Sequence, residues 1–165
     1  MIKVVVLDFD GVIKESLMAK GLVFYDLFDD ISQEQRDYAL TFHLERPGVP
    51  RIKKIRRLYR EFFGRAPQAG EENLLLNRFS ERVISLVVAS EFVKGALEFL
   101  ESSTRPVYIS SATPQEELCG IVSALGLNKY FKSVYGSPAT KDEHLEHILA
   151  ITNVLPEHIV FVGDS

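Results

Sequence analysis

The feature that most constrains the fold is a set of short apolar runs that alternate with helical patterns. The first run, "KVVVLDFDG" at 3–11, is continuously apolar and ends in acids and a glycine, which is typical of a strand covered on both faces. Further runs and helical patterns alternate along the chain: runs at 105–110, 132–137 and 158–164, and helical patterns at 91–103, 114–126 and 141–153. This alternation predicts right-handed βαβ units, and therefore an α/β fold with a Rossmann-like parallel sheet core.

Residues 16–90 interrupt this alternation. They contain four helical patterns and no convincing strand, with the helices expected near 17–29, 32–44, 51–63 and 71–89. The sequence therefore predicts a core built from 1–15 and 91–165, with a helical domain inserted at 16–90. The insertion carries a net charge of +2 (12 basic, 10 acidic residues) and the remainder −6 (7 basic, 13 acidic), so an anionic substrate at the core would need a cation.

Composition excludes several classes of protein. No apolar run reaches the roughly 20 residues that span a bilayer, and the first strand leads into acids, unlike a signal peptide. A single cysteine, Cys119, excludes an intramolecular disulfide and suits a reducing compartment. We therefore expect a cytoplasmic protein without a membrane partner, with Cys119 as a small buried residue on a helix.

Two acids leave the first strand together. Asp8 and Asp10 flank Phe9, and residues two apart in an extended strand point the same way. Such carboxylates repel unless a metal ion or a proton separates them, and Gly11 allows a sharp turn directly afterwards. A nucleophilic Asp with a second Asp as acid/base fits phosphoryl transfer through an aspartyl-phosphate, whereas the plainer alternative is a strand-end Asp turn.

The second run is expected to end at Ser110 and to lead into a helix. Thr113, Pro114 and Glu116 fit the N-cap, the first helical position and the acid of a capping box. Ser110 and nearby backbone N–H groups would then lie beside a helix N-terminus, which favours anion binding. The alternative is that Ser110 only marks the end of a strand.

A lysine opens the helix expected at 141–153. Thr140 and Glu143 form a capping-box pattern around Lys141. A cation there opposes the helix dipole, so its presence is easier to explain if it faces an anion. A solvated surface lysine is the alternative.

The stretch "LDFDGVIKES" resembles the first motif of the haloacid dehalogenase-like (HAD) phosphohydrolase superfamily. The resemblance is to its phosphatase branch with an alpha-helical cap, which includes phosphoglycolate phosphatase and β-phosphoglucomutase-like members, and it extends over essentially the whole chain. It implies that Asp8 is the nucleophile and that Asp10 is the general acid/base. An acid at Asp10 favours phosphate ester chemistry over carbon–halogen or carbon–phosphorus cleavage.

The later motifs of the superfamily are matched in order. The resemblance implies that Ser110, with Ser111, binds the phosphate and that Lys141 neutralises the nucleophile and the phosphorylated intermediate. It also implies a Mg²⁺ site in which Asp8, Asp164 and the backbone carbonyl of Asp10 supply the oxygen ligands that Mg²⁺ prefers.

The inserted helices resemble the cap that selects the substrate in this superfamily. The "GVPR" stretch resembles a cap loop of β-phosphoglucomutase-like members whose Arg reaches the substrate, which makes Arg51, with Lys54, the candidate for holding a carboxylate or a second phosphate. Basic residues are dense across 46–60 (seven, with no acid), a pattern usual for a solvated face. No aromatic interleaving or known module in this stretch supports nucleic-acid binding.

The sequence thus predicts a Mg²⁺-dependent phosphomonoester hydrolase acting on a small phosphorylated metabolite. A phosphomutase is one alternative, although Ser111, Ala112 and Thr113 lack the lysine that mutases use for the second phosphate. A non-catalytic binding protein on a HAD scaffold is the other. Family members usually continue past "GDS" with a second acid, so we also expect a truncated copy with weakened or no turnover; the oligomeric state is not predicted.

Overall fold

The structure is a computed structural model that describes residues 1–164, and it divides into two compact units. One unit joins Met1–Glu15 to Ser90–Asp164, and the other comprises Ser16–Ala89. Ser165, the last residue of the predicted core, lies outside the described residues.

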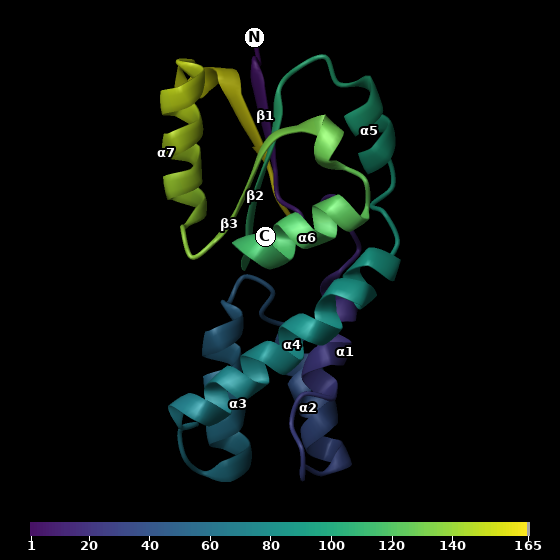
Figure 1. The fold of residues 1–165 in the computed structure, drawn as a ribbon, viewed down its shortest axis with the longest axis vertical. Helices are drawn as coiled ribbons and strands as arrows, with labels where there is room; N and C mark the ends of the chain where they lie inside the picture. Colours follow the sequence, from purple (N-terminus) through teal and green to yellow (C-terminus); the bar gives the residue numbers. More distant parts are fainter. Residues whose placement is uncertain (165) are drawn as a thin grey trace. The chain divides into compact units, whose positions relative to one another are not determined.

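The first unit is built on a parallel sheet. Its strands within residues 1–164 are β1 (Val4–Leu7), β2 (Val107–Pro114), β3 (Phe131–Ser137) and β4 (Ile159–Val162). Their order is β3-β2-β1-β4, and every neighbouring pair is parallel (Figure 1). The predicted Rossmann-like α/β fold with inserted helices is confirmed.

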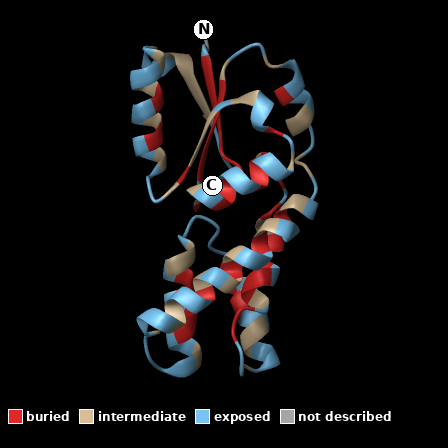
Figure 2. Ribbon diagram, in the orientation of Figure 1, coloured by how far each residue is buried: buried red, intermediate tan, exposed pale blue. Residues whose placement is uncertain are grey.

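Helices cover both faces of this sheet. They are α5 (Ala96–Ser102), α6 (Gln115–Ala124) and α7 (Lys141–Thr152), with 3₁₀ turns η1 at Asn128–Tyr130 and η2 at Pro156–His158. Because parallel crossovers are right-handed, the strand order puts α5 and α6 on one face and α7 on the other. Against α7, Val4, Val6 and Tyr108 pack with Ile148, and the inner strands are almost wholly buried (Figure 2).

One helix start differs from the prediction. Strand β2 runs on to Pro114, which pairs with Ser137 after a register shift, so α6 begins only at Gln115. The capping box predicted at Thr113 is therefore wrong, because these residues still belong to the sheet. The buried position predicted for Cys119 is also wrong, since α6 turns its apolar neighbours inward and leaves this thiol exposed.

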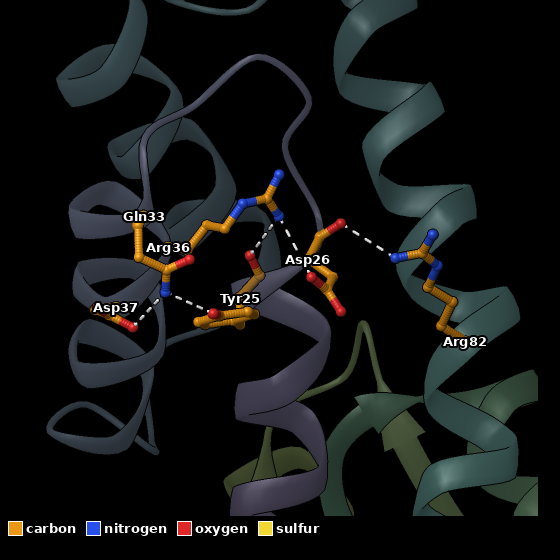
Figure 3. Close-up of polar contacts among 6 residues, drawn as sticks. All are labelled: Tyr25, Asp26, Gln33, Arg36, Asp37 and Arg82. Atoms are coloured by element: carbon orange, nitrogen blue, oxygen red, sulfur yellow. Dashed lines mark hydrogen bonds and ion pairs between the residues drawn. The ribbon is translucent and has the colours of Figure 1, made fainter.

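The second unit is helical. Its helices are α1 (Leu17–Tyr25), α2 (Gln33–Leu44), α3 (Arg51–Phe63) and α4 (Ala69–Ala89). Arg36 of α2 donates to the carbonyl of Tyr25 and to the carboxylate of Asp26, both at 3.3 Å, and Arg82 of α4 donates to the carbonyl of Asp26 at 3.1 Å (Figure 3). These bonds tie the end of α1 to two other helices. In the described part of the chain, no helix combines the length and apolarity needed to cross a membrane.

Candidate active site

A lysine and a buried aspartate form the centre of the candidate site. The Asp8 backbone N–H donates to the carbonyl of Val162 at 2.8 Å, which extends the β1–β4 pairing to the point where the carboxylate leaves the strand. Its Oδ1 accepts from the backbone N–H of Phe9 at 2.7 Å, and its Oδ2 accepts from Lys141 Nζ at 2.5 Å. Both carboxylate oxygens are therefore held in place.

Capping interactions set the position of Lys141. Thr140 Oγ1 accepts from the backbone N–H of Glu143 at 3.2 Å, and the Glu143 carboxylate accepts from the backbone N–H of Thr140 at 2.6 Å. The capping box predicted at the start of this helix is confirmed. It fixes the first turn of α7, so that a cation unfavourable to the helix dipole faces an anion instead.

Burial and charge act in opposite directions on Asp8. Removal from water raises the pKa of the Asp8 carboxyl, while the hydrogen bond and charge of Lys141 lower it. The desolvation effect is the larger, and the net pKa lies above its ordinary value. Lys141 therefore favours the ionised carboxylate, which is the form able to act as a nucleophile, against the effect of burial.

The second acid has a partner that the sequence did not reveal. Thr113 Oγ1 donates to Asp10 Oδ2 at 3.1 Å, and the Thr113 side chain is buried. The carboxyl ends of adjacent parallel strands meet at one edge of a sheet. A hydroxyl residue just beyond the second apolar run could therefore have been predicted to lie near the acids that follow the first run.

The turn after Asp10 lies directly against Asp164. Gly11 has φ +73°, and a β-carbon there would come within 2.0 Å of Asp164 Oδ2. Only glycine permits both this backbone conformation and this approach. The carboxylate of Asp164 is thereby placed beside the backbone that follows Asp10.

The two serines predicted to bind phosphate are placed differently. Ser110 is fully buried, and its Oγ lies 2.8 Å from Nδ1 of His144. The expectation that the strand ends at Ser110 is wrong, because β2 continues to Pro114. Ser111 is also buried, and its Oγ accepts from the backbone N–H of Thr113, the partner of Asp10, at 3.1 Å.

The predicted substrate-binding residues of the insertion lie on α3. Arg51 donates to Ser80 Oγ at 3.1 Å, and its guanidinium lies 4.0 Å from the centre of the Phe79 ring. Lys54 is buried, with Nζ 3.0 Å from Nδ1 of His43. Both are thus ordered within the helical unit, and their contact with a substrate stays a prediction.

A family model for haloacid dehalogenase-like hydrolases matches residues 2–165. The chain belongs to this family. No functionally curated protein sequence matches the HAD chain significantly.

Solved HAD structures share its fold at low sequence identity. A predicted phosphoglycolate phosphatase from Haemophilus somnus superposes with a TM-score of 0.74 at 15% identity, covering 99% of this chain and 77% of that one. A β-phosphoglucomutase from Clostridium difficile superposes with a TM-score of 0.72 at 18% identity, covering 100% of this chain and 77% of that one. The putative HAD-hydrolase YfnB from Bacillus subtilis, described as bound to magnesium, superposes with a TM-score of 0.67 at 17% identity, covering 99% of this chain and 80% of that one.

The HAD chain offers oxygen atoms suited to magnesium at the end of β1. Among residues 1–164 there is no group of three His, Cys, Asp or Glu side chains able to hold a metal ion. Asp8 lies at the end of β1, where its backbone pairs with Val162, and the Asp164 carboxylate lies against Gly11, the residue after Asp10. Carboxylate and carbonyl oxygens are the ligand types that Mg²⁺ prefers, and a shared metal site of Asp8, Asp164 and the Asp10 carbonyl stays a prediction.

Proposed function

We propose that this HAD hydrolase is a Mg²⁺-dependent phosphomonoesterase that forms an aspartyl-phosphate on Asp8. The observation that carries the proposal is the Asp8 carboxylate, buried and held between the Phe9 N–H and Lys141 Nζ. An ion pair that only stabilises the fold could lie anywhere on the surface. This one joins the end of a strand to the start of a helix, at the edge where parallel sheets bind ligands.

The chemistry assigned to the two acids is a double displacement. Asp8 attacks phosphorus in line with the ester oxygen, so that one O–P bond forms while the ester O–P bond breaks, and Asp10 gives its proton to the departing alkoxide. Asp10 then takes a proton from water, which attacks the aspartyl-phosphate, regenerates the Asp8 carboxylate and releases inorganic phosphate. The Thr113 hydroxyl holds Asp10 in the orientation for both transfers.

Positive charge would stabilise the transferring phosphoryl group. Lys141 Nζ donates one hydrogen bond to Asp8, and its remaining N–H donors would contact the equatorial oxygens of the phosphoryl group. A Mg²⁺ ion held by Asp8, Asp164 and the Asp10 carbonyl would supply further neutralisation of the phosphate. Of the two serines, Ser111 is the proposed phosphate donor, because its oxygen already accepts from Thr113 and its O–H remains available to donate.

The substrate is proposed to be a small metabolite with a second anionic group. Arg51 and Lys54, both on α3 of the helical unit, are assigned to that group. The helical unit would then act as the cap that selects the leaving group.

The direct test is Mg²⁺-dependent release of phosphate from p-nitrophenyl phosphate by the wild-type chain and by Asp8→Asn. We expect release of nitrophenol by the wild type, even at the weakened turnover expected from the sequence, and loss of this release in the variant. Turnover that survives Asp8→Asn would refute an aspartyl-phosphate mechanism. A panel of phosphorylated metabolites would then identify the substrate, and isomerised product with a sugar phosphate acceptor would indicate the mutase instead.

A further inference from the structure

A chain of buried hydrogen bonds links β2, α7 and β3 beneath the candidate site. His144 lies on α7, with Nδ1 2.8 Å from Ser110 Oγ on β2 and Nε2 3.2 Å from the carbonyl oxygen of Gly136 on β3. Ser110 is 0% exposed and His144 is 4% exposed. Each ring nitrogen thus has one partner, and the partners belong to two different strands.

The acceptor at one end determines where the protons lie. A carbonyl oxygen can only accept, so Nε2 of His144 carries hydrogen and donates to Gly136. In the neutral ring Nδ1 is then an acceptor, and it receives the hydroxyl hydrogen of Ser110.

The surroundings keep this ring neutral. Burial lowers the pKa of His144, against smaller opposing effects of the Gly136 hydrogen bond and the Glu143 charge. The Tyr135 ring stacks on His144 with a centroid distance of 5.5 Å, and Tyr108 stacks in turn on Tyr135. Lys141 is the nearby cation on the same helix, and its charge is directed to Asp8.

This arrangement removes Ser110 from the set of phosphate donors. Side chains alternate along a strand, so Ser110 shares the α7-facing side of β2 with Tyr108, which packs against Ile148. Its hydroxyl hydrogen points to His144 and is not available to an anion at the end of the strand.

The hydrogen bonds of His144 also fix the position of Lys141. His144 follows Lys141 by three residues and therefore lies one helical turn further along α7. Anchoring His144 to both β2 and β3 fixes the rotation and the height of the first turn of α7. A rotation of this turn would move Lys141 Nζ off Asp8 Oδ2, a contact that now measures 2.5 Å.

We infer that Ser110 and His144 are positioning residues that lock the first turn of α7 to the sheet and so hold Lys141 on Asp8. The catalytic part of this inference rests on the function proposed above for Asp8 and Lys141. The structural part, the lock itself, does not.

Hydrogen exchange of the segment 138–148 tests the lock without any turnover. His144→Phe keeps a ring beside Tyr135 but removes both nitrogens, while His144→Gln replaces them with an amide that can accept from Ser110 and donate to Gly136. His147→Phe is the matched control, because His147 is exposed on the same helix and its ring also contacts Tyr135, at 5.5 Å.

We expect about tenfold faster exchange of this segment in His144→Phe and in Ser110→Ala, with His144→Gln and His147→Phe near the wild type. Equal exchange in His144→Phe and His147→Phe would overturn the inference. If circular dichroism shows His144→Phe unfolded, Ser110→Ala gives the same test with a milder change, and wild-type exchange in that variant overturns it.

A double-mutant cycle tests the link to catalysis. We expect His144→Phe to lower kcat about tenfold with little change in KM in the wild-type background, and less than about twofold in the Lys141→Met background. Equal losses in both backgrounds would show a general structural effect and overturn the positioning role.

The two experiments separate the two proposals. If the wild type shows no turnover that depends on Asp8, the proposed function fails, and the exchange measurement still decides whether the lock exists. If turnover depends on Asp8 but His144→Phe behaves as His147→Phe does, the lock fails and the function stands.

Discussion

Lys141 Nζ lies 2.5 Å from Asp8 Oδ2, although the two residues are 133 positions apart in the chain. The contact joins the end of the first strand to the first turn of α7, and the capping box of Thr140 and Glu143 makes it possible by fixing that turn. It is the relationship on which the proposed chemistry depends most directly.

Removal of the lysine should impair the chemical step. Lys141→Met is expected to lower kcat by roughly 10²–10³, because in the proposed mechanism its charge stabilises both Asp8 and the transferring phosphoryl group. Steady-state hydrolysis of p-nitrophenyl phosphate measures the effect. Lys132→Met, at an exposed lysine of β3, is the control, and a similar loss there would show that total charge matters more than position.

Neutralisation of Asp8 should stabilise the metal-free protein. Burial raises the pKa of Asp8 above its ordinary 3.8, so the folded state retains a proton at pH values where the unfolded chain has lost it. Stability due to this group therefore rises as the pH falls through the folded pKa. Asp8→Asn in EDTA should unfold at a higher temperature than the wild type at pH 7.5, and the difference should shrink toward pH 4. A variant less stable than the wild type at pH 7.5 would contradict this prediction.

Loss of the hydroxyl beside the second acid should reduce turnover. Thr113→Val keeps the shape of the buried side chain but removes its hydrogen bond to Asp10. We expect kcat to fall about tenfold to a hundredfold, the range for a hydrogen bond to a charged group, while Thr113→Ser retains most activity. If Thr113→Ser loses as much as Thr113→Val, packing of the methyl group is the cause.

A methyl group at the turn should disturb metal binding. In Gly11→Ala the new β-carbon would meet Asp164 Oδ2 at 2.0 Å, in addition to a strain of about 1–2 kcal/mol from the left-handed backbone. Gly126→Ala is the control, since Gly126 has φ +67° but its β-carbon would meet no atom of the described chain within 4 Å. We expect both variants to lose stability and only Gly11→Ala to need more Mg²⁺ for half-maximal activity. Equal Mg²⁺ dependence in the two variants would remove Asp164 from the metal site.

Charge at the start of α3 should affect specificity. Arg51→Ala is expected to raise KM roughly tenfold for the true substrate and much less for p-nitrophenyl phosphate, which carries no second anionic group. Arg57→Ala is the control, because Arg57 is exposed and pairs with Glu61 on its own helix. Equal effects of Arg51→Ala on both substrates would indicate that its contacts with Ser80 and Phe79 matter only for folding.

The sequence by itself determined the parallel sheet, the helical insertion and the location of the two acids at the end of β1. These follow from local rules, since apolar runs, capping residues and glycine preferences act over a few neighbouring positions. The same rules misplaced the start of α6, because the pairing of Pro114 with Ser137 is a contact between strands that local propensity does not report.

Only the tertiary structure decided which side chains meet. The partners of Asp8, Asp10 and Ser110 are Lys141, Thr113 and His144, and each partner lies on a different element from the residue that it meets. Register, helix rotation and burial select these pairs, and all three depend on packing over the whole core. For that reason a serine that looked like a phosphate ligand in the sequence is, in the folded chain, hydrogen-bonded to a buried histidine.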